Sequence, residues 1–362
     1  MPTKYLVAFI SFNAALFCQP VANLAPVPEN PFELAGRGVQ LVNSPGERDA
    51  LIRLLNRARA YYRLNDAGLA YELKTSFTVN SRGATEFDGD WELDQVAAPG
   101  LGVHLTARTG GHVFEQLRTP NAAYQNTPSG SFPLRLHEAH GHLLGSLEGP
   151  SGIRHDVIRT VAASWNGAAV TCVLLSPPTR SADVNSPGRL WQEREECLDP
   201  QTGHLLLHSP APGLYVLYDY SQSYRLASRE LPGKMTVIEN DATVIEERIE
   251  SLEHLAKVDP SSFAPTAEMQ AEPRGAVMAG LRKISLGPAN ASGDIQSVVV
   301  FGLLTPDGKI TEVHPLQSSD PALNDAALRR VSQMKLPVAV APGADREQHE
   351  LFAVVHLAPG TL

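Results

Sequence analysis

The chain has 362 residues, an ordinary apolar fraction of 43% and a formal net charge of −9. This length is sufficient for two domains with cores of their own. The negative charge disfavours general attraction to nucleic acid or anionic lipid headgroups, and no basic cluster in the sequence offsets it. We therefore expect no nucleic acid partner.

The N-terminus has the pattern of a secretory signal peptide. Lys4 precedes an apolar stretch, Leu6 to Phe17, that only two polar residues interrupt, and small residues follow it. An apolar core of about a dozen residues is too short to cross a hydrocarbon layer of roughly 30 Å. We expect residues 1–25 to be removed on export, the mature chain to have no transmembrane span, and the protein to be periplasmic.

Cys18 follows this stretch directly and raises an alternative, a lipid anchor attached to the cysteine after cleavage. That processing prefers a small residue before the cysteine, whereas this chain has the bulky Phe17. A buried helix or a short membrane anchor are the other interpretations of the stretch.

A capping box opens the first expected helix. Ser44 and Glu47 are spaced so that each side chain can satisfy a backbone donor of the other. Helical spacing then places a stripe of apolar residues on one face, at Leu51, Leu54, Leu55, Ala58 and Tyr62. We expect this helix, over residues 47–64, to pack on a core.

From Tyr71 onward, short alternating runs replace the helical pattern. They predict strands at 71–79, 85–93, 102–108, 112–119, 158–163, 168–175, 191–197, 204–208, 214–220, 234–239 and 243–252. Turns rich in Gly, Asp, Asn and Pro separate these runs, as in a large antiparallel sheet. The regular spacing favours a curved sheet or half-barrel, whose concave face the helix at 47–64 and the segment 133–147 would cover.

This order of helix, strands, lid and strands is similar to that of the LolA-like periplasmic lipoprotein carriers. The stretch Asp199 to His204 and the later run Pro232 to Val237 carry the resemblance, which covers residues 44–256. It implies a half-open antiparallel barrel around an apolar cavity. The alternative is a β-rich exported domain with a solid core.

Cys172 and Cys197 lie on either side of an excursion rich in Ser, Pro and Asp, residues 176–188. In an exported protein such a pair is more often a disulfide than a metal or catalytic site. A disulfide closing this loop would contribute on the order of 3 kcal/mol, mostly by restricting the unfolded chain. The alternative is two buried thiols.

The run His137-Glu138-Ala139-His140-Gly141-His142 resembles a cluster of zinc ligands. An H-E-x-x-H site needs histidines four residues apart on one helix face, and here the first pair is three apart. His155 or His112 would have to complete the ligand shell. We interpret these histidines as structural or surface residues, and we expect neither a metal nor a cofactor.

The sequence contains no nucleophile elbow, phosphate-binding glycine loop or dinucleotide fingerprint. We therefore expect a protein that is not an enzyme. A metal-dependent hydrolase is the remaining enzymatic interpretation, and it depends on the segment 137–142.

Residues 259–281 are rich in Pro, Ala and Ser and have little periodicity, which is typical of a semi-extended linker. This linker would separate a β-rich domain over residues 26–258 from a smaller domain over residues 282–362.

The smaller domain has the clearest local pattern in the chain. An apolar run at 297–304, an Asp-Gly turn at 307–308 and a second run at 310–314 predict a β-hairpin. Asp320 and Pro321 then open a helix. A further apolar run at 351–357 completes the order strand, turn, strand, helix, strand.

These residues resemble the C-terminal domain of TonB-family proteins. The match comprises Val298-Val299-Val300, Asp307-Gly308-Lys309, Ser318-Ser319 and Pro321 to Leu328. The family usually ends the helix with Trp and Phe anchors, where this chain has Met334 and Leu336. The resemblance covers residues 280–358 and implies a small ββαβ domain that docks to other proteins.

The whole sequence thus predicts an α+β protein, with a large antiparallel sheet or half-barrel and covering helices followed by a small ββαβ domain. Our leading hypothesis is a non-catalytic periplasmic protein whose TonB-like module docks to envelope proteins and is linked to transport across the envelope. The alternative is a carrier or sensor of a hydrophobic ligand, a lipid or lipoprotein, bound by the half-barrel.

If the module docks as its family does, it would add a strand edge to an extended segment of another envelope protein. Backbone hydrogen bonds would then supply the affinity. We expect that edge to be formed by Leu351, Phe352, Ala353, Val354 and Val355. The alternative is that this strand is paired within its own sheet or in a dimer.

Overall fold

The computed structural model describes residues 27, 38–81, 85–126, 133–145, 147, 153–165, 168–177, 188–271, 283–287, 295–305, 308–336 and 349–358. The expected signal peptide, residues 1–25, lies outside the described residues, and so does Cys18.

As far as the structure describes it, the larger part of the chain is a succession of strands together with the α-helices α1 and α2. Its elements are β1 (Gln40–Leu41), α1 (Pro45–Tyr62), η1 (Leu64–Ala67), β2 (Tyr71–Val79), β3 (Gly89–Ala98), β4 (Gly102–Thr109), β5 (His112–Arg118), β6 (Ala123–Asn126), α2 (Leu134–Gly145), β7 (Val157–Trp165), β8 (Ala168–Ser176), β9 (Arg194–Leu198), β10 (Leu205–Ala211), β11 (Leu214–Leu226), β12 (Arg229–Glu239), β13 (Ala242–His254), η3 (Pro260–Phe263) and β14 (Gln270–Ala271). The C-terminal elements are β15 (Lys283–Leu286), β16 (Gln296–Leu304), β17 (Ile310–Ser318), η4 (Pro321–Leu323), α4 (Asn324–Ser332) and β18 (His349–Leu357).

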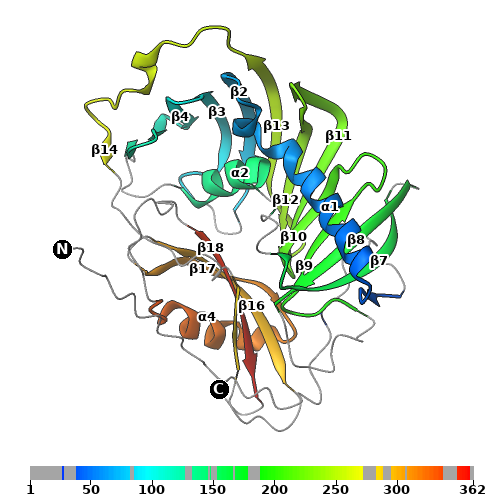
Figure 1. Cartoon of the computed structure of the whole chain (residues 1–362). Coiled ribbons are helices and arrows are strands. Elements are labelled where there is room, and N and C mark those ends of the chain that lie inside the picture. Colours follow the sequence, from blue (N-terminus) through cyan, green and yellow to red (C-terminus); the bar gives the residue numbers. More distant parts are fainter. Residues whose placement is uncertain are drawn as a thin grey trace, which may run out of the picture.

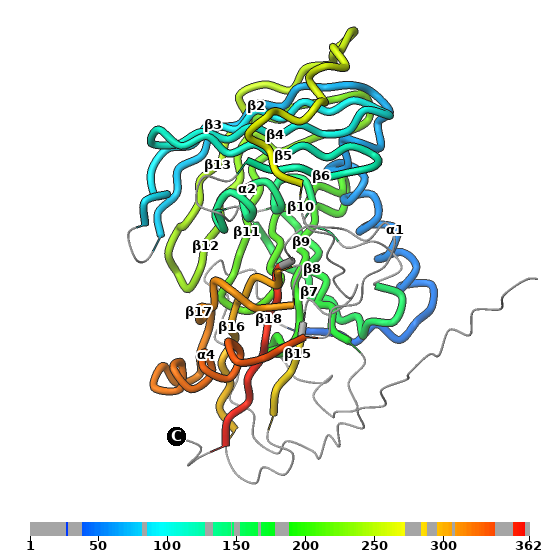
Figure 2. Tube along the Cα trace, turned by 90° about the vertical axis from the view of Figure 1, so that its left-hand side faces the viewer, coloured from blue at the N-terminus to red at the C-terminus, as the bar shows by residue number. Residues whose placement is uncertain are grey.

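The strands β1 to β14 form one open antiparallel sheet, which we call the large sheet. Its fourteen strands lie in the order β1-β7-β8-β9-β10-β11-β12-β13-β2-β3-β4-β5-β6-β14. Figure 1 shows the sheet curving around α2, and Figure 2 shows the same arrangement from the side. The expected large antiparallel sheet is confirmed, with expected strands found close to their positions.

Alternation along each strand separates two faces of the large sheet. In β2, Tyr71, Leu73 and Phe77 are buried on the concave face, where α1 and α2 lie. The opposite, convex face has smaller apolar clusters of its own, one of them around Cys172 and Cys197.

The first helix forms as its sequence predicts. The Ser44 hydroxyl accepts a hydrogen bond from the backbone N–H of Glu47 at 3.4 Å, and Pro45 occupies the first turn. Leu55, Ala58 and Tyr62 from the predicted stripe are buried against the large sheet. The helix therefore covers one part of the concave face.

The C-terminal elements form a second sheet with strand order β15-β18-β16-β17, which we call the small sheet. The predicted element order is confirmed, with β16 and β17 as an antiparallel hairpin and α4 between β17 and β18. Gly308 has a φ of +82°, which the turn requires. The Asp307 that precedes it lies outside the described residues.

The two faces of the small sheet are both buried, but in different cores. Val300, Ala353 and Val355 pack with Ala327 and Val331 of α4. The other face contributes its apolar side chains to the core of the large sheet, namely Val299, Phe301, Leu303, Leu316, Phe352 and Val354. The expected division at residues 259–281 therefore separates two sheets that share one core.

The expected linker is an integral part of the fold over its described portion. In residues 259–271, Phe263 and Met269 are buried against Leu117 on the convex face of the large sheet, and β14 pairs with β6. The linker prediction is wrong for these residues, because two apolar side chains in a Pro- and Ser-rich stretch suffice to anchor it. Residues 272–281 lie outside the described part of the chain.

Within the described residues, none of the helices combines the length and apolar character that crossing a membrane requires.

Candidate functional site

The concave face of the large sheet is an apolar surface enclosed by separate elements. The side chains lining it include Leu73, Phe77, Trp91, Leu93, Leu105, Phe114, Val216, Met235 and Val237, all buried. Leu136, Ala139 and Leu143 of α2 and Phe301 and Phe352 of the small sheet pack on it. In both views α2 lies between strands of the large sheet and the small sheet.

The histidine-containing segment 137–142 lies in α2, and its polar side chains contact different partners. Glu138 accepts a hydrogen bond from Arg135, and the His140 Nε2 lies 2.6 Å from the Gln95 side-chain oxygen. The His142 Nε2 lies 3.5 Å from Glu350 of β18. Helical geometry thus turns these neighbours in sequence toward three parts of the molecule.

A metal site needs several ligand atoms close together within the part of the chain that the structure describes. There, the one group of three or more candidate ligands within mutual reach is Cys172, Glu195 and Cys197, and its two sulfurs are joined in a disulfide. His112 lies on β5, where it packs against Phe87. The segment 137–142 is therefore not brought together with His112 as a ligand shell.

A buried group of charges joins α2 to both sheets, and we call it the junction. It comprises Arg135 and Glu138 of α2, Glu239 of β12 and His314 of β17. Arg135 makes a two-pronged contact with Glu239, at 2.6 and 2.8 Å, and a further hydrogen bond of 2.6 Å to Glu138. The His314 Nε2 lies 3.4 Å from Glu239, so the small sheet takes part.

Burial and charge set the protonation of the junction in opposite directions for its two carboxyl groups. Burial, together with the neighbouring Glu239, raises the pKa of Glu138 to about 8 despite Arg135. For Glu239, burial acts upward, but hydrogen bonds from Arg135 and His314 outweigh it and lower the pKa to about 2. Glu239 in turn raises the pKa of His314 against the effect of burial. The junction therefore holds an ionised Glu239 and a proton on Glu138.

A second polar contact lies beside the junction. Burial, with His208 nearby, lowers the pKa of His142 to about 3, so its ring is neutral near pH 7. The rings of His142 and His208 are 6.0 Å apart, and the His208 Nδ1 lies 2.8 Å from Glu196 of β9. The Tyr218 hydroxyl donates to the His142 carbonyl oxygen at 2.9 Å, which fixes the end of α2 on β11.

A chain of hydrogen bonds ties the middle of α2 to the other side of the sheet. The side-chain oxygen of Gln95 accepts a hydrogen bond from His140, and its side-chain nitrogen donates one to the Tyr71 hydroxyl at 2.7 Å. Tyr71 donates onward to Asn65 at 2.9 Å. These contacts connect α2 to β2 and β3.

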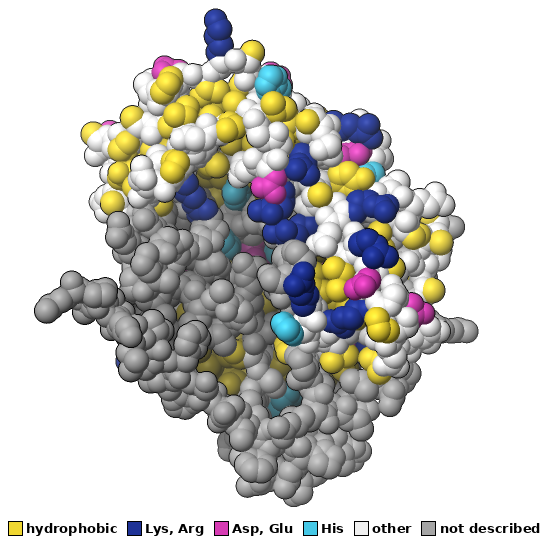
Figure 3. Space-filling model, viewed as in Figure 1, with side chains coloured by type: hydrophobic (Ala, Val, Ile, Leu, Met, Phe, Trp, Pro, Cys, Tyr) yellow, Lys and Arg dark blue, Asp and Glu magenta, His cyan; other side chains and the backbone are white. Residues whose placement is uncertain are grey.

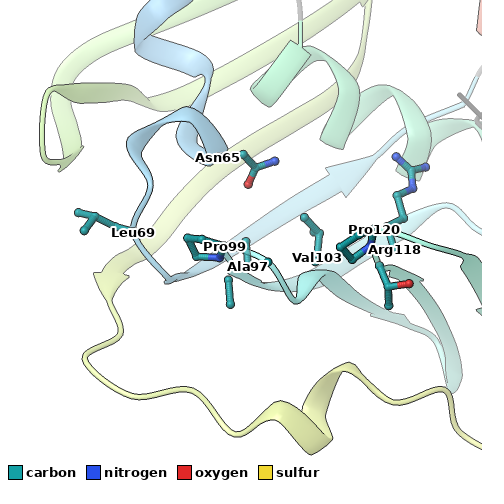
Figure 4. A pocket seen from close by; sticks show the side chains of 11 residues that line it. Asn65, Leu69, Ala97, Pro99, Val103, Arg118 and Pro120 are labelled. Atoms are coloured by element: carbon teal, nitrogen blue, oxygen red, sulfur yellow. The ribbon is translucent and has the colours of Figure 1, made fainter. Parts of the chain in front are cut away.

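A pocket of about 310 Å³ lies beside η1, and Asn65, the last residue of this series of hydrogen bonds, lines it. Figure 4 shows Asn65 and Arg118 on different sides of it, with the apolar Ala97, Pro99 and Val103 between. The volume is at the lower limit for ligand pockets. It is large enough for a small group or for part of a longer apolar ligand.

The outer surface over α1 is positively charged. Arg53, Arg57 and Arg63 are exposed on this helix. Figure 3 shows Lys and Arg side chains gathered over α1, beside a face where apolar side chains cover the strands around β2 and β4. This positive charge is confined to the surface over α1, because the chain as a whole carries a charge of −9.

The cysteine pair is joined as the sequence predicts. Cys172 of β8 and Cys197 of β9 are direct cross-strand partners and form a disulfide with a Cα–Cα distance of 3.9 Å. Both residues are buried on the convex face, away from the junction. The bond therefore stabilises the sheet and has no part in the candidate site.

The expected docking edge is not an edge in this structure. Strand β18 pairs antiparallel with β16 over its whole length and parallel with β15, which covers residues 352–355. Leu351, Phe352, Ala353, Val354 and Val355 are all nearly inaccessible to solvent. The prediction of a free strand at Leu351 to Val355 is wrong, because backbone groups paired on both sides cannot accept another strand.

Sequence reasoning missed Arg135, Glu239 and His314 of the junction, and also Glu350, which lies at His142. Each is a common polar residue in an otherwise ordinary strand or helix, and only the packing of the two sheets brings them together. A partial signal was present in Glu239, a charged residue at the end of an apolar strand.

Comparison with known proteins gives structural neighbours only. No family model matches the sequence, and no curated protein matches it. The LolA superfamily protein NE2245 from Nitrosomonas europaea matches with a TM-score of 0.37 and 10% identity, over 59% of this chain and 96% of that chain. The MucA/MucB complex of Pseudomonas aeruginosa matches with a TM-score of 0.28 and 14% identity, over 62% of this chain and 63% of that chain.

LprF from Mycobacterium bovis matches with a TM-score of 0.23 and 13% identity, over 60% of this chain and 98% of that chain. Of the neighbours named here, one is described as a LolA superfamily protein and none as a TonB protein. TM-scores of this size carry no argument about function, which has to come from the geometry of the chain itself.

Proposed function

We propose that the protein is a non-catalytic carrier or sensor of the bacterial envelope that binds a hydrophobic ligand against the concave face of its large sheet. The observation that carries this proposal is the apolar concave face, which is closed by α1, α2 and the small sheet rather than by the strands themselves. Covers that belong to separate elements can move apart without breaking the strand pairing beneath them.

The junction supports this proposal, because it is polar and lies between the covers. Arg135, Glu239 and His314 join α2, the large sheet and the small sheet through charges. Buried ion pairs specify one arrangement more than they add stability. In the closed form the covers lie on the concave face, and in the open form they have moved apart. The free-energy difference between the two forms is smaller when polar contacts hold the covers than when an entirely apolar interface does.

The cellular location within this proposal follows from the cysteines. A buried disulfide between Cys172 and Cys197 requires an oxidising compartment, as found outside the bacterial cytoplasm. Docking through Leu351 to Val355 is not part of the proposal, since that strand is paired on both sides.

The proposal is tested with the full-length mature protein, purified without detergent. Organic extraction and mass spectrometry should recover a lipid in near-stoichiometric amount, or the delipidated protein should bind the apolar dye 1-N-phenylnaphthylamine saturably. A protein that carries no lipid and shows no saturable dye binding contradicts the proposal.

Two neighbouring substitutions in β18 provide a matched comparison. Phe352 faces the large sheet, whereas Leu351 faces α4. Phe352→Ala enlarges the space over the concave face and should increase dye binding several-fold, whereas Leu351→Ala creates space elsewhere and should leave it unchanged. Equal effects of the two variants would place the dye outside the concave face.

A further inference from the structure

Glu247 is buried in the apolar surface of the concave face, opposite Phe77 and Met235. The residue is 1% exposed, and among the described residues neither of its carboxyl oxygens has a hydrogen-bond partner of good geometry. The hydroxyl of Thr75, a residue 3% exposed, likewise makes no well-formed hydrogen bond within the described part of the chain, and it is the polar group that acts on Glu247. Buried polar atoms without partners are few in proteins, and each requires an explanation.

The strand register places the two groups together. Glu247 of β13 lies directly opposite Phe77 of β2 and opposite Met235 of β12. Thr75 is two residues before Phe77 on the same face of β2, so it is the diagonal neighbour of Glu247. The two polar groups therefore form one spot surrounded by apolar side chains.

Other polar side chains on this face are partnered. Glu239 is bonded to Arg135, Gln95 to Tyr71 and His140, and Tyr62 to Tyr220. The spot at Glu247 and Thr75 differs from these in having a carboxyl group with both oxygens unsatisfied. Such a group destabilises the closed protein, whereas replacing it by an apolar residue would not.

The protonation of Glu247 indicates which chemical group would match it. Burial raises its pKa to about 8 although the neighbouring Thr75 hydroxyl acts to lower it, so the carboxyl group is mainly neutral near pH 7. A neutral carboxylic acid donates one hydrogen bond and accepts others, and a threonine hydroxyl does the same. A ligand group that both donates and accepts, such as an amide or a hydroxyl, would satisfy both residues.

We propose that Glu247 and Thr75 anchor the ligand by hydrogen bonds to an uncharged amide or hydroxyl group carried on an acyl chain. The inference rests on the proposed function and adds the chemical class of the ligand to it. A plain alkyl chain would leave the hydrogen-bonding groups of Glu247 and Thr75 unsatisfied. An anionic headgroup would be placed beside a carboxyl group that has no positively charged partner among the described residues. The acyl chain of the ligand would enter beneath α2, whose Leu136 and Ala139 pack over this face.

The test measures displacement of 1-N-phenylnaphthylamine from the full-length delipidated protein. The competitors are dodecanamide and N,N-dimethyldodecanamide, which differ in the amide donor. The wild type should prefer dodecanamide by about tenfold or more, the ratio expected when a buried polar group loses its partner. Glu247→Gln, which also donates and accepts, should keep the preference within about threefold.

Glu247→Leu should show no preference between the two amides when each displacement is expressed relative to that variant's own affinity for the dye. It should also melt at a higher temperature, because it removes an unsatisfied buried group. Thr75→Val provides a second variant and should reduce the preference, measured in the same way relative to its own affinity for the dye. Retention of the full preference in both variants overturns the inference and leaves the proposed function standing.

Two other outcomes separate the possibilities. Absence of dye binding in the wild type removes the proposed function and this inference with it. Displacement by dodecylamine about tenfold tighter than by dodecanamide, lost in Glu247→Gln, would assign the spot to a cation and overturn the uncharged ligand.

Discussion

Two carboxyl groups at the junction face the guanidinium of a single arginine. Arg135 gives its two-pronged contact to Glu239 and a single hydrogen bond to Glu138. With the charge of Arg135 already balanced by Glu239, a second buried negative charge would lack compensation. Glu138 therefore keeps its proton near pH 7, which is what its raised pKa of about 8 expresses.

This arrangement predicts a loss of stability in base. Glu138 holds its proton more tightly in the folded chain than in the unfolded chain, where its pKa is near 4.5. Its stabilising contribution is therefore complete below about pH 4.5 and is lost as the pH rises through about 8. Glu247 acts in the same direction, with a pKa of about 8.

Urea denaturation at pH 6 and pH 9 measures the effect. The free energy of unfolding of the wild type should fall across this interval, by at most about 1.4 kcal/mol per pH unit for each of the two groups. Glu138→Gln removes one contribution, and the double variant with Glu247→Gln removes both. A wild type and a double variant with the same pH slope would contradict the assignment.

The sequence predicts the individual residues of the site only in part. The segment 133–147 is expected to cover the concave face, where α2 lies, and the spacing within 137–142 argues against H-E-x-x-H zinc chemistry. The partners of that helix lie far away in sequence, at Glu239, His314 and Glu350, and no local pattern pairs them. Long-range polar contacts of this kind depend on how two sheets pack, which residue types and spacing do not record.

At the level of single elements, the turn between β10 and β11 makes a backbone contact with the small sheet. A Cβ atom added at Gly213 would collide with the carbonyl oxygen of Leu316 in β17. Gly213 also has a φ of +89°, which side chains disfavour. This close approach leaves room for glycine alone.

Gly213→Ala should therefore loosen the small sheet. Hydrogen exchange of amides in β16 and β17 should become faster by at least about tenfold, and the protein should be destabilised by more than about 1 kcal/mol. Gly111→Ala is the matched control, because Gly111 has a φ of +91° but no atom of the described residues within 4 Å of the added Cβ. Equal exchange in the two variants would mean that backbone strain, and not the contact with Leu316, accounts for the effect.

The cross-strand disulfide between β8 and β9 gives a second prediction for single elements. Its loop spans a sequence separation of 25 residues, so reduction should lower the free energy of unfolding by about 3 kcal/mol. Chemical denaturation with and without dithiothreitol measures this difference. The variant with both Cys172→Ala and Cys197→Ala should not respond to the reductant, and an unchanged wild type would argue against the bond.

Most elements were predictable from the sequence, whereas the pairing of the small sheet was not. The Asp-Gly turn, the Asp320-Pro321 start and the apolar runs predict the hairpin, helix and last strand correctly. The run at 297–304 is apolar at nearly every position, a pattern typical of a strand buried on both faces. That pattern was the available signal that the small sheet packs on two sides.

At the scale of the whole molecule, one core extends through both sheets. Phe301 and Phe352 of the small sheet belong to the same apolar cluster as Trp91 and Phe114 of the large sheet. Neither sheet can separate without exposing this cluster to water, which is unfavourable in proportion to the apolar area. The composition of residues 259–281 predicted two independent domains, because composition does not show which faces are covered.

The shared core predicts cooperative unfolding. Calorimetry should give a single transition, with equal calorimetric and van't Hoff enthalpies, for the mature protein without ligand. Far-ultraviolet circular dichroism and tryptophan fluorescence should report the same midpoint. Two resolved transitions, or midpoints that differ between the probes, would mean that the sheets unfold separately.

The position of β18 also has a consequence for the order of assembly. This strand comes after β15, β16 and β17 in the chain, yet it lies between β15 and β16 in the small sheet. A chain that emerges from a translocation channel N-terminus first must wait for residues 349–357 before β15 and β16 have a neighbour in common. Until then the part of the apolar concave face that the small sheet covers stays exposed, so newly synthesised molecules need protection from aggregation or from proteases during that interval.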